Sequence, residues 1–332
     1  MAATAEALPV LETEAMPVEQ SQLRLILRRF ARHRLAVVSS AVLVFIFLLA
    51  GAVRSLVPYD ATEIEVGNSF AVPFSVSPKD GRTHYLGTDH LGRDYWSRIL
   101  YAARISLTIA VVSVIGATAV GALVGALSGY FGGALDDILM RFVEFLLTIP
   151  TLPILLILSS ILLQSPKAVP VPDFIINGLS GFMYISALEA RQVVMIMLVL
   201  MSLGWLGIAR LTRGVVLSLK TMNFVEAARA SGVSTTRIIL RHMIPNAFAP
   251  LVVSASLGLA DYVISEAALS FLGFGIQDPT PTWGNMLSFT ESYMFEHPWL
   301  PLIPGLPIFI CALAFNYVGD GLRDALDPRL QL

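Results

Sequence analysis

Two acidic residues, Asp261 and Glu266, interrupt an otherwise apolar stretch at residues 247–275. A charged Asp at the centre of a membrane helix costs roughly 2.5 to 3.5 kcal/mol on insertion scales, so both side chains should face protein or water. They could line a translocation path and meet the amino group of a substrate, or pair with polar groups where two membrane subunits meet. A proton relay through both acids is a third alternative and would make the chain an ion-coupled secondary transporter.

The sequence lacks the usual patterns of covalent, nucleotide or metal chemistry. It contains no G-x-x-x-x-G-K-[ST], no H-E-x-x-H and no G-x-S-x-G. The single cysteine, Cys311, lies in an apolar run, where we expect a small core residue. Three histidines of the polar segments, His84, His90 and His297, are not at metal-ligand spacing. We therefore predict no catalytic residue, no metal site and no cofactor in this chain.

Residues 223–245 form a polar, basic segment between apolar stretches. Asn223 followed three residues later by Glu226 predicts a capping-box start of a helix, and Gly232 predicts its left-handed end. Ser234 is then expected to cap a second helix that ends at Pro245. Two short helices joined by a glycine elbow are suited to docking on a cytosolic partner.

The order of residues in this segment resembles the EAA loop of ABC-importer permeases, E-A-A-x3-G-x9-I-x-L-P. The matching positions are Glu226, Ala227, Ala228, Gly232 and Pro245. The departures are His242, where isoleucine is usual, and Ile244, where leucine is usual.

The resemblance implies that the loop couples the chain to a partner ATPase, and it suggests the following candidate coupling residues: Glu226, Ala227, Ala228, Arg229, Gly232, Ser234 and Pro245. The small alanine side chains permit close approach, and the first helix would act as a rigid lever. Glu226 either caps its own helix or pairs with a basic residue of the ATPase.

Further motifs are similar to the dipeptide and oligopeptide branch of these permeases. They are G-T-D-H-L-G-R-D at 87–94, G-Y-F-G-G at 129–133, A-L-S-F-L-G-F-G at 268–275, W-G-N-M-L at 283–287 and G-D-G-L-R-D-A-L-D-P-R at 319–329. The resemblance implies a heterodimer with a second homologous permease subunit, served by two ATPase subunits and an extracytoplasmic substrate-binding protein. ATP and Mg would bind to the ATPases. The implied substrates are di- or oligopeptides, with nickel or another small solute as the alternative.

The composition independently indicates an integral membrane protein. Of the 332 residues, 55% are hydrophobic and 14% are charged, whereas soluble domains carry about 25% charged residues. A net charge of -2 argues against a nucleic-acid partner. The lipid bilayer is therefore the expected environment, and the motifs imply a bacterial or archaeal cytoplasmic membrane.

Apolar segments predict an all-α protein with six transmembrane helices, at 35–57, 105–129, 139–163, 193–208, 247–275 and 300–318. Pro150 and Pro153 should bend the third. Glycines at four-residue spacing, from Gly121 to Gly133, should let the second approach a neighbour closely. The resemblance adds the type I ABC-importer permease fold.

We divide the chain accordingly. Residues 1–34 are expected to be a cytosolic tail with a basic amphipathic lead-in, 35–57 the first transmembrane helix, and 58–104 an extracytoplasmic loop with an interface helix that begins at Asp94. Residues 105–322 would form the permease core, with the coupling loop at 214–245, and 323–332 a cytosolic tail. The connection at 164–191 is longer than the resemblance leads us to expect, and it could be re-entrant or lie on the surface.

Basic residues set the expected orientation. With the N-terminus in the cytosol, 14 of the 22 Lys and Arg residues fall on the cytosolic side. An excess of Lys and Arg marks cytoplasmic loops. Six spans then place both termini and the 223–245 segment in the cytosol.

Overall fold

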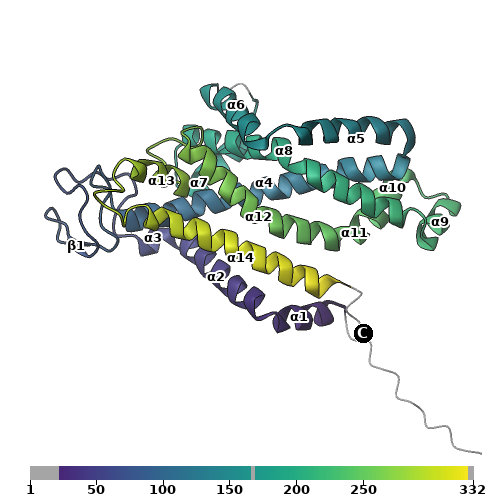
Figure 1. The fold of residues 1–332 in the computed structure, drawn as a ribbon, viewed down its shortest axis with the longest axis horizontal. Helices are drawn as coiled ribbons and strands as arrows, with labels where there is room; N and C mark the ends of the chain where they lie inside the picture. Colours follow the sequence, from purple (N-terminus) through teal and green to yellow (C-terminus); the bar gives the residue numbers. More distant parts are fainter. Residues whose placement is uncertain (1–21, 166–168, 328–332) are drawn as a thin grey trace, which may run out of the picture.

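The protein is an elongated bundle of helices (Figure 1). The computed structural model describes residues 22–165 and 169–327. A loop with strands β1 (Ser75–Val76) and β2 (Thr83–His84) lies at one end. Helices α1 (Gln22–Arg32), α9 (Asn223–Ala230) and α10 (Thr235–Ile238) lie at the other end. Of the expected tails at 1–34 and 323–332, residues 1–21 and 328–332 fall outside the described residues.

Five helices of the described residues are long and apolar enough to cross a membrane. They are α2 (Arg34–Gly51), α4 (Tyr95–Phe131), α8 (Ala187–Leu219), α12 (Phe248–Phe271) and α14 (Leu302–Leu326). The pair α5 (Gly133–Thr148) and α6 (Thr151–Gln164) makes a sixth span if it is counted as one, bent by 93°. The all-α prediction with six spans is confirmed in this sense.

The bend between α5 and α6 falls at the predicted prolines. Ile149 has an extended backbone (ψ 133°) because a residue before proline is disfavoured in the α region. Pro150 then occupies the N-cap position of α6, and Pro153 lies in its first turn, where a missing N–H is tolerated.

Helix α4 is longer than predicted. The expected interface helix and the second span form one continuous helix, Tyr95–Phe131. Asp94 caps it as predicted, since its carboxylate accepts a hydrogen bond from the Ser97 backbone N–H at 2.7 Å. The charged first turns are therefore part of the transmembrane rod. They form a rigid link between the membrane and the loop at residues 58–94, which we call the outer loop.

Glycines let α4 approach α8 closely. A Cβ atom at Gly121 or Gly125 would collide with the α8 backbone, and one at Gly129 would meet Arg213. The packing prediction is therefore confirmed for these positions. Gly133 is different, because it lies after the end of α4 with a φ of +58° and has no neighbour within 4 Å of a Cβ. It serves the turn into α5.

Helices α3 (Val53–Leu56), α7 (Asp173–Met183) and α13 (Trp283–Glu291) lie near the end that carries the β strands (Figure 1). The long connection contains α7, which packs on α8 through Ile176; residues 166–168 of this connection are outside the description. Strands β1 and β2 pair antiparallel, with Ser75 opposite His84.

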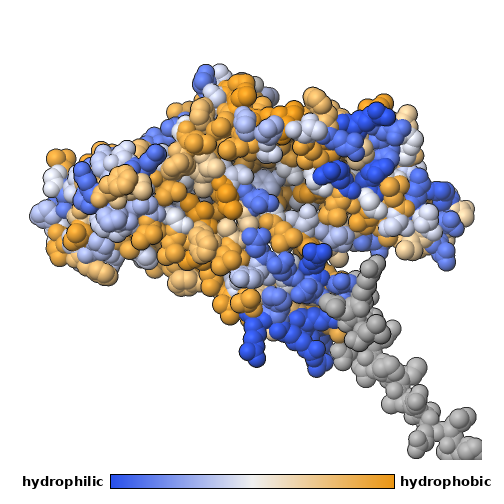
Figure 2. All heavy atoms as spheres, viewed as in Figure 1, coloured by the Kyte–Doolittle hydropathy of each residue, from blue (hydrophilic) through white to orange (hydrophobic). Residues whose placement is uncertain are grey.

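The surface follows this arrangement. Figure 2 shows apolar residues along the sides of the bundle and hydrophilic residues gathered near α1 and α9. Large apolar side chains such as Phe45, Phe145 and Phe309 are exposed on the helices, as expected for a surface that faces lipid. The Arg29 side chain donates to the Asp327 carbonyl at 3.2 Å, which ties α1 to the end of α14.

Candidate functional site

The predicted glycine elbow is present between α9 and α10. Gly232 has a φ of +74°. Its N–H donates to the Arg229 carbonyl at 3.0 Å, and the Val233 N–H donates to the Ala228 carbonyl at 3.1 Å. These two bonds close the end of α9 in a Schellman motif. The left-handed backbone is the reason why the position requires glycine.

The predicted capping box at Asn223 is wrong. The N-cap of α9 is Met222, whose extended backbone (ψ 143°) precedes the first helical residue, and it offers no side-chain cap. Asn223 lies inside the first turn, so its side chain is one position too late to cap. Ser234 does occupy the N-cap position of α10, but its side chain makes no capping hydrogen bond.

The predicted helix end at Pro245 is also wrong. After α10 the chain continues through a π-helical segment, η1 (Ile239–Met243), into α11 (Ile244–Asn246), and α12 begins directly after Ala247. A proline lacks an N–H and clashes with the carbonyl four residues earlier. The wider π turn before Pro245 offers a physical reason why the helical path continues.

Buried apolar contacts fix the elbow to the transmembrane rods. Val225 of α9 is fully buried. It belongs to a cluster with Tyr130 of α4, Val216 of α8, and Ile238 and Met243 beyond the elbow. Because α4 and α8 both end in this cluster, a force on α9 would act on two long helices at once.

The opposite face of α9 is exposed. Glu226, Ala227 and Arg229 are exposed, and Ala228 is half-buried. Within the described ranges the Glu226 carboxylate makes no hydrogen bond and no ion pair, so the structure gives no support to local capping by Glu226. The Arg229 guanidinium lies 5.7 Å from the centre of the Tyr130 ring. The exposed face is therefore small and polar, with a free carboxylate.

A hollow lies beside α12, and we call it the α12 hollow. It has a volume of about 380 Å³ and is lined by α4, α5, α6, α8 and α12. Its polar groups include Asp261, Tyr262, Ser254 and Ser265. Asp261 is exposed, and the Tyr262 hydroxyl has no hydrogen-bond partner among the described residues. The hollow thus offers unsatisfied polar groups within an apolar wall.

Glu266 does not line this hollow. It is fully buried and accepts a hydrogen bond from the Ser270 hydroxyl at 2.8 Å. Its neighbour Ala267 packs against α13, where a Cβ at Gly284 would collide with the Ala267 backbone. Five residues along a helix correspond to about 140° around its axis. The two acids therefore point to different sides of α12, which argues against a relay between them.

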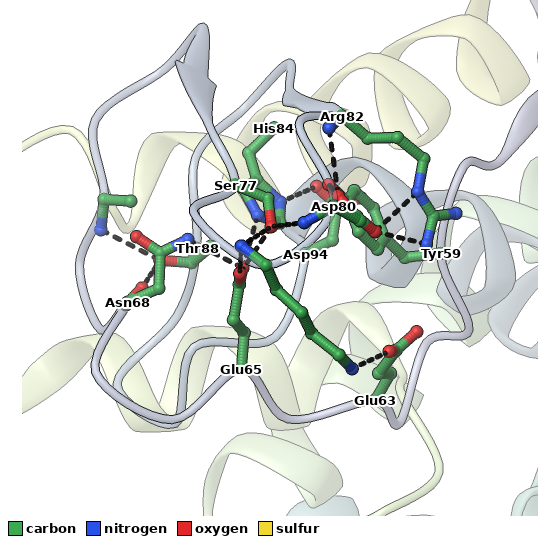
Figure 3. A network of polar contacts seen from close by, with 12 residues as sticks. Tyr59, Glu63, Glu65, Asn68, Ser77, Asp80, Arg82, His84, Thr88 and Asp94 are labelled. Carbon is green, nitrogen blue, oxygen red and sulfur yellow. Dashed lines mark hydrogen bonds and ion pairs between the residues drawn. The ribbon is translucent and has the colours of Figure 1, made fainter.

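The outer loop contains a buried polar network that was not predicted from the sequence (Figure 3). His84 is 1% exposed. Its Nδ1 lies 2.8 Å from the Asp94 carboxylate, and its Nε2 lies 3.0 Å from the Glu65 carboxylate. Glu65 also accepts hydrogen bonds from the Ser77 hydroxyl and the Asn68 amide. The histidine is therefore held between two carboxylates and joins the loop to the start of α4.

A second buried cluster joins this loop to the segment before α13. Asp89 contacts the Arg93 side chain at 2.6 Å, and the other side of that guanidinium contacts Asp278 at 2.6 Å. Arg98 lies 3.2 Å from Asp278 and is 1% exposed. Gly87 and Gly92 form tight turns beside this cluster, with φ of +77° and +80°. The dense charges at 88–98 are the signal in the sequence that could have indicated this cluster.

The outer loop should lose stability in acid because of Glu65. Burial raises the pKa of Glu65, but hydrogen bonds from Ser77, Asn68, His84 and the Lys79 backbone outweigh burial and lower the pKa to about 2. The stabilising contribution is complete above the ordinary value of 4.5 and is lost as the pH falls toward 2. The protection factors for hydrogen exchange in residues 58–94 should therefore fall across this range. In Glu65→Gln, protection should be lower at neutral pH and should vary less between pH 5 and 2; an unchanged pH profile of protection would contradict the assignment.

Comparison with known proteins identifies similar sequences. A family model described as "Binding-protein-dependent transport system inner membrane component" matches residues 121–332. A second model, "N-terminal TM domain of oligopeptide transport permease C", matches residues 21–73.

Individual relatives match along nearly the whole chain. The Mycobacterium bovis "Oligopeptide transport system permease protein OppC" is 34% identical over 93% of this chain and 95% of its own length. The "Dipeptide transport system permease protein DppC" of Alkalihalophilus pseudofirmus is 33% identical over 92% of this chain and 89% of its own length. The "Glutathione transport system permease protein GsiD" of Pectobacterium atrosepticum is 35% identical, with 92% and 90% covered. Among solved structures, a chain of the inward-facing MetNI methionine ABC transporter aligns at a TM-score of 0.48 and 17% identity over 69% of this chain and 97% of that chain.

Proposed function

The chain belongs to the family of binding-protein-dependent transport system inner membrane components, and from this premise we propose that it carries short peptides across the membrane in an ATP-driven importer. It is a multi-pass membrane permease subunit. The relatives are named for oligopeptides, dipeptides and glutathione, all of which are short peptides. Nickel or another small solute is the alternative cargo.

One structural observation supports the proposal most: the exposed helix α9 is anchored to α4 and α8 by the buried Val225 cluster. A helix seated in a cleft of a partner ATPase would transmit closure of that ATPase as a tilt of both rods. The proposed coupling residues are Glu226, Ala227, Ala228, Arg229, Gly232, Ser234 and Pro245. Of these, Gly232 shapes the elbow, and Pro245 lies on the helical path into α12.

The proposed assembly contains a second, homologous permease subunit, two ATPase subunits and an extracytoplasmic binding protein. ATP and Mg would act on the ATPases, and this chain would hold no cofactor. The proposed location is the cytoplasmic membrane of a bacterium or archaeon. Transport would proceed by alternating access, in which ATP binding opens the path outward and hydrolysis returns it to the inward-facing state.

In this proposal the α12 hollow belongs to the translocation path. Asp261 is exposed there, so its carboxylate could attract the charged amino group of a peptide. Glu266, in contrast, would support the packing of α12 on α13.

The function can be tested by uptake into proteoliposomes that contain the complete assembly. We expect uptake of a labelled tripeptide to require both ATP and the binding protein. Uptake of nickel instead of peptide would select the alternative cargo. Uptake driven by a proton gradient without ATP, together with failure of any ATPase to co-purify with this chain, would contradict the importer assignment and favour a secondary transporter.

The substitution Asp261→Asn tests whether the Asp261 carboxylate contributes to the translocation path. Because the carboxylate lies in the α12 hollow without a partner in the described chain, its loss should leave assembly and basal ATP hydrolysis unchanged. Uptake of a peptide with a free amino terminus should fall about tenfold, which corresponds to about 1.4 kcal/mol. Uptake of the N-acetylated peptide, relative to the free peptide, should rise in the variant. Equal losses for both peptides would indicate a role unrelated to the amino group.

A further inference from the structure

A small groove opens on the side of the bundle where α2, α4 and α7 meet. It has a volume of about 250 Å³, and its lining includes Phe47, Gly51, Leu107, Val112 and Phe182. Phe47, Val112 and Phe182 are substantially exposed. Such a groove on a transmembrane surface suits an acyl chain, but apolar lining alone would not distinguish an acyl chain from any other apolar occupant.

The charge at one end of the groove indicates which kind of apolar molecule could occupy it. Arg104 lines it and is 7% exposed. Its Nη1 lies 3.4 Å from the carbonyls of Ala50 and Gly51. Its Nε is buried and has no hydrogen-bond partner in the described part of the chain. A buried guanidinium N–H without an acceptor is costly, so this end of the groove lacks an anionic or strongly polar acceptor.

A second arginine stands beside it. The Arg54 guanidinium lies 3.7 Å from the centre of the Tyr184 ring, and that of Arg104 lies 4.4 Å from the same ring. Neither arginine forms an ion pair with another residue of the described ranges. The nearby Asp60 is engaged with the Thr62 backbone N–H at 2.8 Å and its hydroxyl at 2.6 Å. Two cations that share one ring favour an anion between or beside them.

The depth of the arginines matches a lipid headgroup. Helix α2 has 18 residues, so it rises about 27 Å, close to the roughly 30 Å of the hydrocarbon core. Arg104 contacts the last residues of α2, which places its guanidinium near the membrane boundary on the side of the outer loop. Phosphate groups of that leaflet lie at this level.

We propose that this groove binds one anionic phospholipid of the leaflet on the side of the outer loop. The phosphate accepts hydrogen bonds from the accessible edge of the Arg104 guanidinium, while Arg54 adds charge. One acyl chain follows Phe47, Leu107 and Val112. Guanidinium groups suit phosphate because their planar N–H groups bind its oxygens in charge-assisted pairs. The lipid would tie α2 and α4 to the connection that follows α7.

The test is native mass spectrometry of the purified assembly titrated with phosphatidylglycerol or phosphatidylcholine of equal chain length. Wild type should bind one phosphatidylglycerol per copy of this chain, at least tenfold more tightly than phosphatidylcholine. Arg104→Gln should weaken phosphatidylglycerol binding at least tenfold. Val112→Trp, which fills the groove at an exposed position and keeps both arginines, should weaken both lipids.

The matched control is Arg237→Gln, which removes an exposed charge from α10 at the opposite end of the bundle and should leave lipid binding unchanged. Equal affinity for the two lipids, or unchanged phosphatidylglycerol binding in Arg104→Gln, would overturn the proposal. Displacement of the lipid by millimolar inorganic phosphate would overturn the assignment of a lipid and indicate a site for free phosphate.

Discussion

Peptide uptake should fall at least tenfold in Glu226→Lys while the protein still inserts and folds. Glu226 is exposed, and its carboxylate makes no hydrogen bond or ion pair with other residues of the described chain. Its replacement should therefore change stability by no more than about 0.5 kcal/mol. If α9 docks in a partner ATPase, however, the change from an acid to a base at the docking face adds repulsion against any basic partner. Lost electrostatic complementarity of this kind costs several kcal/mol at an interface.

Three measurements separate coupling from folding: ATP-driven uptake, co-purification of the ATPases, and the thermal unfolding midpoint of the purified chain. The matched control is Asp137→Lys. Asp137 is also an exposed acid, but it lies in the first turns of α5, so the same charge reversal is made outside α9. Uptake should survive in the control. Normal uptake in Glu226→Lys, or equal losses in both variants, would exclude a specific role for Glu226.

The second large effect is expected from Asp89→Ala, which should destabilise the protein by about 3 to 5 kcal/mol. Asp89 is 3% exposed and contacts the Arg93 side chain at 2.6 Å, while Arg98 lies 3.7 Å away. Its removal leaves two arginines, 2% and 1% exposed, with Asp278 as their remaining acid. An uncompensated buried charge is the reason for the large cost.

The midpoint of thermal unfolding should fall by about 10 °C in this variant. Asp89→Asn keeps the shape and an acceptor for the backbone N–H groups of Leu91 and Arg93, so it should recover part of the loss. Glu63→Ala, in the same loop, breaks an exposed pair with Lys79 and should leave the midpoint nearly unchanged. A midpoint for Asp89→Ala within 2 °C of wild type would show that the cluster contributes little.

Features that depend on neighbours in the sequence could be predicted from it. The number of spans follows from the length and hydropathy of each apolar segment, and the bend after α5 follows from Pro150. The elbow between α9 and α10 was predictable from Gly232, because only glycine adopts the left-handed backbone angle of this position without strain. Asp94 was recognisable as a cap because a cap bonds to a residue three positions away.

Local sequence patterns predicted the wrong helix boundaries at two positions, where the same residues are compatible with two different structures. Asn223 and Glu226 have capping-box spacing, yet the N-cap of the helix lies one residue earlier, at Met222. Pro245 usually ends a helix, but the π turn of Ile239–Met243 carries the helical path past it. Both outcomes depend on how Val225 and Met243 pack against α4 and α8, and that packing involves residues far away in the chain.

By itself, the sequence determined the class of the protein, its spans, its family motifs and the elbow, because hydropathy, caps and turns act over a few residues. Only the tertiary structure decided which charges meet. Asp278 reaches Arg93 across 185 positions, Asp261 turns to a hollow while Glu266 is enclosed, and Arg104 arrives at the end of α2. The sequence alone does not show whether a charged loop residue is solvated or buried. Burial depends on packing between segments that are far apart in the chain, and a buried charge then requires a partner.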